Sequence, residues 1–180
     1  MTVSSTNLIQ GPADVYTAPF GTAEPATIAT TPAGPSWVNV GGTREGVNLV
    51  HEKTFADLTV DQIVDVIESR VTGRSVMLNT TLAEPTLVNL ARAFADAAPV
   101  SNVAEPDVGA AAFRPSYFAL IIDGIAPGGF RRRITIRKAL QTSSVETGYK
   151  KDGMTLLPVS FKAHWVSSAI RPFRIEDATA

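Results

Sequence analysis

The order of apolar and polar residues predicts β-strands over most of the chain. Residues 116–125 form an apolar run, which is typical of a buried strand. Residues 131–140 and 157–165 alternate instead, with the period of two that places successive side chains on opposite faces of a sheet. In the first of these segments one face carries Ile134, Ile136 and Leu140 and the other Arg133, Thr135 and Arg137. In the second, an apolar face of Leu157, Val159, Phe161, Ala163 and Trp165 lies opposite Ser160, Lys162 and His164.

Strand signals also fill residues 37–82. Residues 37–40 form a short apolar stretch that ends at Gly41 and Gly42, a predicted turn. Residues 44–55 alternate loosely, and residues 58–82 are rich in β-branched side chains. We expect two long strands between residues 58 and 82, joined by a connection that the pattern does not locate.

One segment is predicted to be helical. Apolar residues recur at intervals of three and four, which gives a single stripe made of Leu87, Leu90, Ala91, Phe94 and Ala98. Thr81 and Glu84 have the spacing of a capping box, Pro85 suits a first turn, and Pro99 ends the segment. The sequence therefore predicts a helix at about residues 84–97 that buries Phe94 against a sheet.

The two ends of the chain are predicted to be arms. Residues 1–36 are rich in Pro, Gly, Thr and Ala, a composition that breaks helices and leaves short extended pieces. We expect an N-terminal arm over residues 1–36, a β domain over residues 37–180, and a C-terminal arm at about residues 170–180. Removing residues 1–20 is then expected to spare folding and to impair polymerisation. Together these elements predict a mainly β fold, a sandwich or open barrel sheet with one flanking helix.

Composition narrows the choice of function. Net charge is −1, but residues 1–110 carry 5 basic and 12 acidic side chains, whereas residues 111–180 carry 11 and 5. The two parts neutralise each other within one sheet, or they form complementary patches between neighbouring subunits; both interpretations stay open. The chain has no cysteine, which excludes a disulfide framework and thiolate metal sites. Residues 1–10 have no basic region and no apolar core, so we expect no signal peptide.

No group of residues in the sequence has the pattern of a catalytic site. His51 and His164 are the two histidines, and a histidine on a strand is more often a solvated or hydrogen-bonded side chain than a ligand. No metalloprotease, nucleophile-elbow or phosphate-loop pattern is present in the sequence. We therefore expect a protein that is not an enzyme and has no cofactor or metal site.

Two charged groups are the candidate surface residues. Asp57, Asp61 and Asp65 recur every four residues on a predicted strand, which puts them on one face at intervals of roughly 13 Å. That spacing is too wide for a pair of catalytic carboxylates, so the stripe is interpreted as a solvated surface. In an assembly it would face a channel or meet the arginines of a neighbouring subunit. The basic residues Arg131, Arg133 and Arg137 form the second group, for which salt bridges to acidic strands are favoured over nucleic-acid binding.

Several stretches resemble the major tail tube proteins of long, non-contractile-tailed (siphovirus-type) bacteriophages. The resemblance rests on the order of motifs along most of the chain: the stretch from Asn7-Leu8 through Gly21-Thr22-Ala23-Glu24-Pro25, residues 37–46, residues 55–62, Arg70-Val71-Thr72-Gly73-Arg74 running on into residues 81–91, Tyr149-Lys150-Lys151-Asp152-Gly153 and Pro172-Phe173-Arg174-Ile175.

The resemblance implies a virion protein of the phage tail, assembled in the host bacterial cytoplasm. Six subunits would join their sheets into a ring barrel, and stacked rings would form a channel through which DNA passes in transit, without a membrane partner. A long loop, at about residues 42–57, and the arms would bridge rings. The implied partners are other copies of the chain, a tape-measure protein, a tail terminator and distal tail proteins.

Other functions fit the sequence less well. A carbohydrate-binding module would need a platform of exposed aromatic side chains, and Trp165 is predicted on an apolar face. A small hydrolase would need a nucleophile with a base. The nearest alternative within the structural class is a tail terminator or head-tail completion ring protein.

Overall fold

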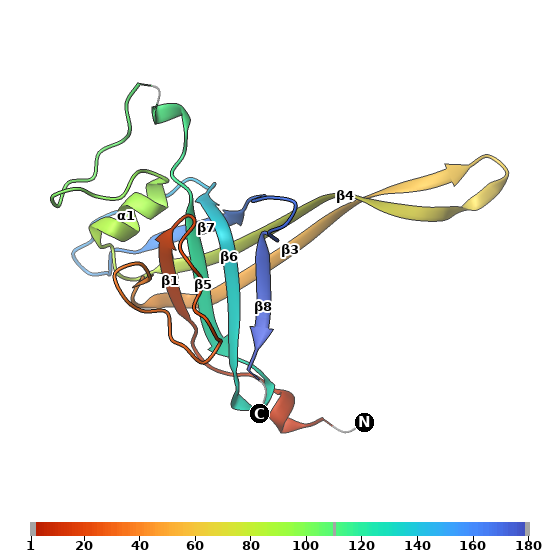
Figure 1. The fold of residues 1–180 in the computed structure, drawn as a ribbon, viewed down its shortest axis with the longest axis horizontal. Helices are drawn as coiled ribbons and strands as arrows, with labels where there is room; N and C mark the ends of the chain where they lie inside the picture. Colours follow the sequence, from red (N-terminus) through yellow and green to blue (C-terminus); the bar gives the residue numbers. More distant parts are fainter. Residues whose placement is uncertain (1–2, 110, 179–180) are drawn as a thin grey trace.

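The computed structural model describes residues 3–109 and 111–178, which form one antiparallel sheet with one short helix (Figure 1). The strands are β1 (Asp14–Pro19), β2 (Val38–Asn39), β3 (Thr43–Val60), β4 (Ile63–Leu82), β5 (Phe118–Ile125), β6 (Arg131–Gln141), β7 (Leu157–Ala163) and β8 (Phe173–Asp177). The helix is α1 (Leu87–Phe94), and three short 3-10 turns are η1 (Ser5–Asn7), η2 (Ala111–Phe113) and η3 (Pro127–Gly129). The predicted mainly β fold with one helix is confirmed.

The sheet has the strand order β2-β1-β5-β6-β7-β4-β3. Strand β6 pairs with β5 along one side, and along its other side with β8 over Arg132–Ile136 and with β7 over Ala139–Gln141. Strands β3 and β4 run across the direction of β5, β6 and β8, so the sheet is strongly curved (Figure 1).

The main core lies inside this curve. One apolar cluster joins Val15 of β1, Leu82 of β4 and Phe161 of β7, although several strands separate β1 from β4 in the sheet order. Phe118 and Phe161 meet edge to face at its centre, with ring centroids 5.1 Å apart. The two layers that a sandwich needs therefore come from one sheet that curls over itself.

A second, smaller core covers the opposite face of β1 and β5. Tyr16, Ala119 and Ile121 project there and are covered by Trp37, whose indole Nε1 donates to the Ala23 carbonyl oxygen at 3.0 Å. The segment between β1 and β2 is thus a cover for the sheet, fixed by a buried tryptophan.

The N-terminal segment contributes more to the sheet than its composition predicts. Strand β1 pairs with β5 over all six of its residues, and Val15 is fully buried. The expectation that residues 1–20 are dispensable for folding is therefore wrong for β1, because a run of apolar side chains between two breaker-rich stretches is long enough to form one strand. The assignment of residues 1–36 as an arm in an assembly stays a prediction, as does the C-terminal arm, although β8 pairs with β6.

Helix α1 is shorter than predicted and presents a different face. Its N-cap is Thr86, whose Oγ1 accepts from the backbone N–H of Asn89 at 3.3 Å, so the predicted Thr81–Glu84 capping box is wrong. Asn89, Ala91 and Ala93 are buried, whereas Phe94 is 50% exposed. Asn89 Nδ2 donates to the carbonyl oxygens of Val40 and Glu84 at 2.8 Å, so a buried amide, not a phenylalanine, fixes the helix.

Two details of the strand faces also differ from the alternation. A register shift between β5 and β6 pairs Phe118 with Ala139, which puts Ala139 in the core in place of Leu140. Strand β7 ends at Ala163, and Trp165 beyond it is 71% exposed, so its predicted place on the apolar face is wrong.

We predict that Phe161→Ala lowers the free energy of unfolding by about 3–5 kcal/mol, because it removes one ring of the buried pair. Phe94→Ala is the matched control and should cost less than half as much, because half of that side chain is already in water. Urea unfolding of both variants measures this. A larger loss for Phe94→Ala would contradict the packing described.

We also predict that deleting residues 1–20 abolishes the cooperative unfolding transition, because β5 loses its partner strand and Val15 leaves the core. Deleting residues 1–10 keeps β1 and should melt close to the full chain. Circular dichroism melting of the two truncations checks this, and equal melting temperatures for both would refute it.

Candidate assembly site

Strands β3 and β4 form a hairpin whose outer part leaves the body of the molecule (Figure 1). Near its base β4 is held on both sides, by β3 and, over Met77–Leu82, by β7. Beyond Met77 the pairing with β7 ends and β4 continues with β3 as a two-stranded ribbon, paired from His51 with Val76 to Val60 with Ile63. Residues 51–72 are all exposed. The prediction of a loop at residues 42–57 is therefore wrong, because most of that segment is strand β3. The bridging role of this segment stays a prediction.

The outer hairpin carries many apolar side chains that its own subunit does not cover. Eight are more than a third exposed: Phe55, Leu58, Val60, Ile63, Val64, Val66, Ile67 and Val71. An isolated two-stranded hairpin is marginally stable in water, and exposed apolar patches of this kind mark sites of protein association. This outer hairpin, residues 55–71, is the first candidate surface.

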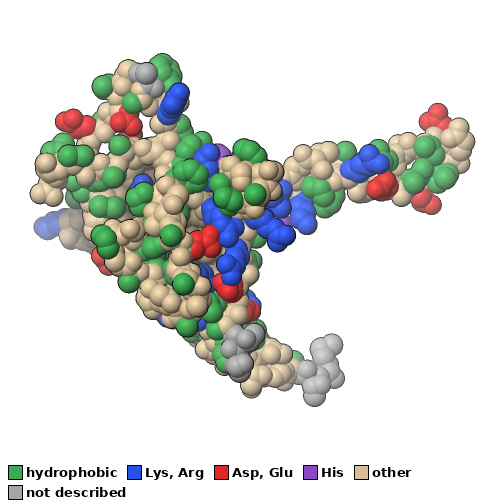
Figure 2. Space-filling model, viewed as in Figure 1, with side chains coloured by type: hydrophobic (Ala, Val, Ile, Leu, Met, Phe, Trp, Pro, Cys, Tyr) green, Lys and Arg blue, Asp and Glu red, His purple; other side chains and the backbone are tan. Residues whose placement is uncertain are grey.

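The three aspartates of the sequence analysis lie on this outer hairpin, but not on one strand. Asp57 is on β3, Asp61 is in the turn at residues 61–62, and Asp65 is on β4. The expected straight stripe with intervals of about 13 Å is wrong, because the chain reverses at Asp61 and Gln62. Asp57 accepts from Ser69 Oγ at 2.6 Å across the hairpin. The acids instead surround a tip (Figure 2).

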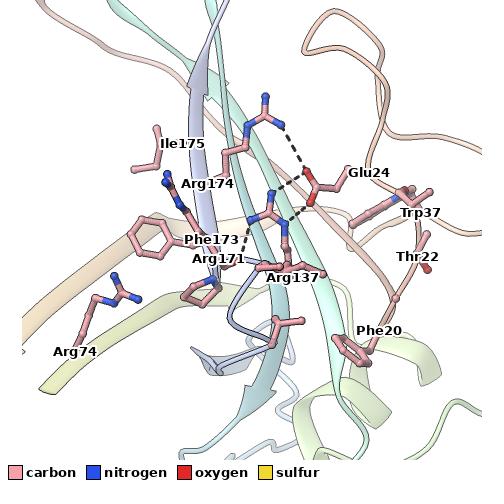
Figure 3. Close-up of a pocket in the computed structure, with 16 residues that line it drawn as sticks. Phe20, Thr22, Glu24, Trp37, Arg74, Arg137, Arg171, Phe173, Arg174 and Ile175 are labelled. Atoms are coloured by element: carbon pink, nitrogen blue, oxygen red, sulfur yellow. Dashed lines mark hydrogen bonds and ion pairs between the residues drawn. The ribbon is translucent and has the colours of Figure 1, made fainter.

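The second candidate surface is a groove of about 1280 Å³ beside the base of the hairpin (Figure 3). It is formed by the start of the β1–β2 segment, β4, β6 and the stretch that leads into β8. Its apolar lining includes Phe20, Trp37, Ile170, Phe173 and Ile175, and its charged lining consists of Glu24, Arg74, Arg137, Arg171 and Arg174. Basic side chains gather on this part of the surface (Figure 2).

An ion-pair network fixes one wall of the groove. Arg137 donates to both carboxylate oxygens of Glu24 and, through Nη1, to the Arg171 carbonyl oxygen at 2.8 Å. Arg174 approaches the same Glu24 carboxylate at 3.8 Å and pairs with Glu176 at 2.6 Å. Residues far apart in the sequence are thus joined. The two arginines of this network are balanced by two glutamates, so the positive excess of the groove comes from Arg74 and Arg171.

The side chains of Arg131 and Arg133, at the start of β6, make contacts within their own subunit. Arg133 is 4% exposed, pairs with Asp123 at 2.7 Å and donates to the Thr27 and Thr30 carbonyl oxygens. Arg131 Nη1 donates to the carbonyl oxygens of Ile28 and Ala29. The prediction that Arg133 lies on an exposed surface is therefore wrong. Its side chain is buried between β5 and the β1–β2 segment, inside the subunit.

Arg132, the neighbour of these two, forms a bidentate pair with Asp177 on β8, with distances of 2.6 and 2.7 Å. The Arg132 guanidinium holds the pKa of the Asp177 carboxyl below its usual value. The ion pairs of Arg132 with Asp177 and of Arg133 with Asp123 are consistent with the prediction that this cluster forms salt bridges and does not bind nucleic acid. The pair attaches β8, which lines the groove, to β6.

The histidines do not form a site. His51 packs edge to face on Phe173. His164 packs on Tyr117, and burial, followed by the charges of Lys138 and Lys162, lowers its pKa. Within residues 3–109 and 111–178, no cluster of three or more His, Asp or Glu side chains has the geometry to hold a metal ion. In the same residues no helix is long and apolar enough to span a membrane.

Most of the groove was not predicted from the sequence. Of its charged residues only Arg137 was a candidate; Glu24, Arg74 and the pair Arg171 and Arg174 come from three other segments. The basic excess of residues 111–180 was the available signal, and it could not show that Arg74 and Glu24 join them. The structure does not bring the aspartates of the tip to the arginines of β6, because the outer hairpin points away from the body (Figure 1).

A curved antiparallel sheet with an uncovered apolar hairpin defines the class of β-sheet structural subunits that associate with other chains. The family comparison agrees: the chain belongs to the phage tail tube protein family, whose model matches residues 2–171. Comparison with individually curated proteins gives no match. Tail tube proteins are structural, not enzymes, and are located in the tail of the virion, as the sequence analysis expects.

We predict that Asp123→Ala lowers the free energy of unfolding by about 3–5 kcal/mol, because it leaves the buried Arg133 guanidinium without its carboxylate. Asp61→Ala, in the exposed tip, is the control and should change it by less than about 0.5 kcal/mol. Chemical unfolding measures both. A neutral Asp123→Ala would mean that Arg133 is not held by this pair.

Proposed function

We propose that this protein is the tail tube subunit of a phage with a long, non-contractile tail. It self-assembles into stacked rings, six subunits to a ring, that enclose a channel for DNA delivery. Membership of the tail tube family supports the structural role, and the resemblance of the motifs supports the siphovirus type and the ring.

The observation that carries this proposal is the outer hairpin. Eight apolar side chains are exposed on a ribbon that β7 does not cover. Burying such side chains against a neighbour is favourable by roughly 25 cal/mol for each Å² removed from water. Association with a neighbour would therefore lower the free energy of these apolar side chains, which the isolated subunit leaves in water.

The ends of the sheet support closure into a ring. Strand β2 stands at one end of the strand order and β3 at the other, and β8 pairs with β6 alone, so the described subunit presents strand edges that its own strands do not cover. Unpaired edges invite pairing with another chain, and a closed ring removes them. Contacts between unlike surfaces generate rings or filaments when repeated, and a tube of stacked rings combines both.

Charged surfaces have two possible roles in such a tube. Asp57, Asp61 and Asp65, with Arg131 and Arg137, belong to the channel or to contacts between subunits. Carboxylates on the channel wall would repel the phosphate backbone and let DNA pass without binding, because phosphate contacts dominate DNA affinity. A tape-measure protein would fill the channel before DNA, and terminator and distal tail proteins would close the ends.

A tail terminator or head-tail completion protein is the second candidate. It would share the fold and the ring but would stop after one ring. The long uncovered hairpin favours the tube, because a contact surface that extends far from the body suits repeated stacking better than a single cap.

Negative-stain electron microscopy of the purified full chain tests the proposal, and we predict tubes of uniform diameter. The matched variant replaces residues 56–70 by Asn-Gly, which connects the paired residues Phe55 and Val71 through a two-residue turn. It should keep the melting temperature, because it removes no core residue, and should form no tubes.

Tubes formed by the shortened variant would contradict the role of the hairpin. Discrete single rings from the full chain would favour the terminator instead. Particles that stay monomeric in the presence of the phage's tail initiation complex would contradict assembly altogether.

A further inference from the structure

We propose that the outer hairpin of one subunit inserts into the arginine-lined groove of a second copy of the chain. The inference rests on the proposed tube assembly and assigns its contact surfaces. It places the acidic tip at an interface between subunits and not on the channel wall.

The outer hairpin has the composition of an inserting element. Residues 55–71 contain four acidic side chains, Asp57, Asp61, Asp65 and Glu68, and one basic side chain, Arg70, for a net charge of −3. Glu68 and Arg70 pair with each other at 3.7 Å in solvent. Asp61 and Asp65 have no ion-pair partner among the residues that the structure describes. The tip thus combines apolar side chains with unpaired carboxylates.

The groove has the complementary composition. Its lining contains four arginines and Glu24, for a net charge of +3, over an apolar floor. Glu24 is already shared by Arg137 and Arg174, and Arg174 also pairs with Glu176, which lies outside the lining. The positive charge that remains without a carboxylate is therefore that of Arg74 and Arg171. Arg74 and Arg171 have no hydrogen-bonded or ion-paired side-chain partner within the described part of the chain. A ligand with carboxylates and apolar side chains would pair with these arginines and cover the apolar lining at the same time.

The size of the groove favours a polypeptide segment. Its volume of about 1280 Å³ exceeds the roughly 300–1,000 Å³ that is usual for a small-molecule site. Phe20, Ile170 and Ile175 are each close to half exposed in it. Nucleic acid would use the arginines but would leave these apolar side chains in water, so the observations favour a peptide ribbon with both chemistries.

The occupant must come from another copy, because the subunit's own tip cannot reach its own groove. Arg74 lines the groove and lies on β4, nine residues after Asp65 along the same strand. At about 3.3 Å per residue the tip stands roughly 30 Å from it. The ribbon is paired along that length, and it points away from the body (Figure 1).

The geometry makes the contact head to tail. Each copy offers one tip and one groove, and the groove lies beside the base of the hairpin whose tip projects. A tip bound at the base of the next hairpin leaves that copy's tip free to bind a third copy, so the contact repeats without limit unless it closes. Such heterologous contacts build rings and filaments.

Site-directed cross-linking of assembled tubes tests the contact, because the chain contains no cysteine. The test variant carries Gln62→Cys in the tip and Ala169→Cys in the groove, which keeps every charged residue of both surfaces. A short bis-maleimide reagent should link it into a ladder of trimers and higher species on a denaturing gel. The control pairs Gln62→Cys with Tyr149→Cys, which is exposed outside the groove, and should give no ladder.

Charge reversal tests the same contact by assembly. Asp61→Lys with Asp65→Lys changes the tip from −3 to +1, and Arg74→Glu with Arg171→Glu changes the groove from +3 to −1. Each pair alone should abolish tubes with an unchanged melting temperature, since these side chains are exposed. All four changes in one chain restore opposite charges and should restore tubes.

The inference is overturned if wild-type tubes give no ladder from the Gln62 and Ala169 cysteines, or if the Tyr149 control gives one. It is also overturned if either reversed pair still forms tubes, which would leave the groove to DNA or another partner, or if the combined variant forms none. Absence of tubes from the wild-type chain with the tail initiation complex would instead contradict the proposed function.

Discussion

Strand β4 is paired on both sides over one part of its length and on one side over the rest, and this difference determines the architecture. Its inner part, Met77–Leu82, lies between β3 and β7 and contributes Leu78 and Leu82 to the core. Its outer part has β3 alone, so the same strand that anchors the hairpin also extends it out of the subunit. The apolar side chains there have no cover in the isolated protein. An associating role follows from this constraint, and the family membership agrees with it.

The distribution of charge follows the same division. Part of the basic excess of residues 111–180 is neutralised inside the subunit, where Arg137 and Arg174 meet Glu24 from the first part of the chain. The acids of the outer hairpin are not neutralised in this way, because the ribbon carries them away from the body. The internal interpretation of the charge split therefore applies to the arginines that pair within the subunit, and internal pairing fixes the groove wall. Contacts between copies stay a proposal for the remaining charges.

Sequence patterns predicted the elements with strong local signals. The apolar run that became β5 and the alternation of β6 and β7 are set by side-chain period, which the sequence shows directly. The patterns failed where distant residues decide. Glu84 has the spacing of a capping box, but its Oε1 accepts from the Gly42 amide at 2.8 Å. Phe94 fits an apolar stripe, yet the helix packs through Asn89, whose partners lie in other segments.

The candidate site was predictable in part for the same reason. The aspartates at residues 57, 61 and 65 were found by their spacing, but the position of the turn decides whether they form a stripe or a tip. Outer hairpin and base look alike in sequence, because both are rich in β-branched residues. Only the pairing with β7 separates them. The groove depends on four segments meeting in space, and no local pattern contains that information.

Association of the outer hairpin with a neighbouring copy can be observed in the assembled tube, by a cryo-electron microscopy reconstruction at a resolution that traces strands. We expect density for residues 55–71 inside the groove lined by Arg74, Arg171 and Phe173 of an adjacent subunit. A hairpin that projects into solvent or into the channel, with that groove empty, would contradict it.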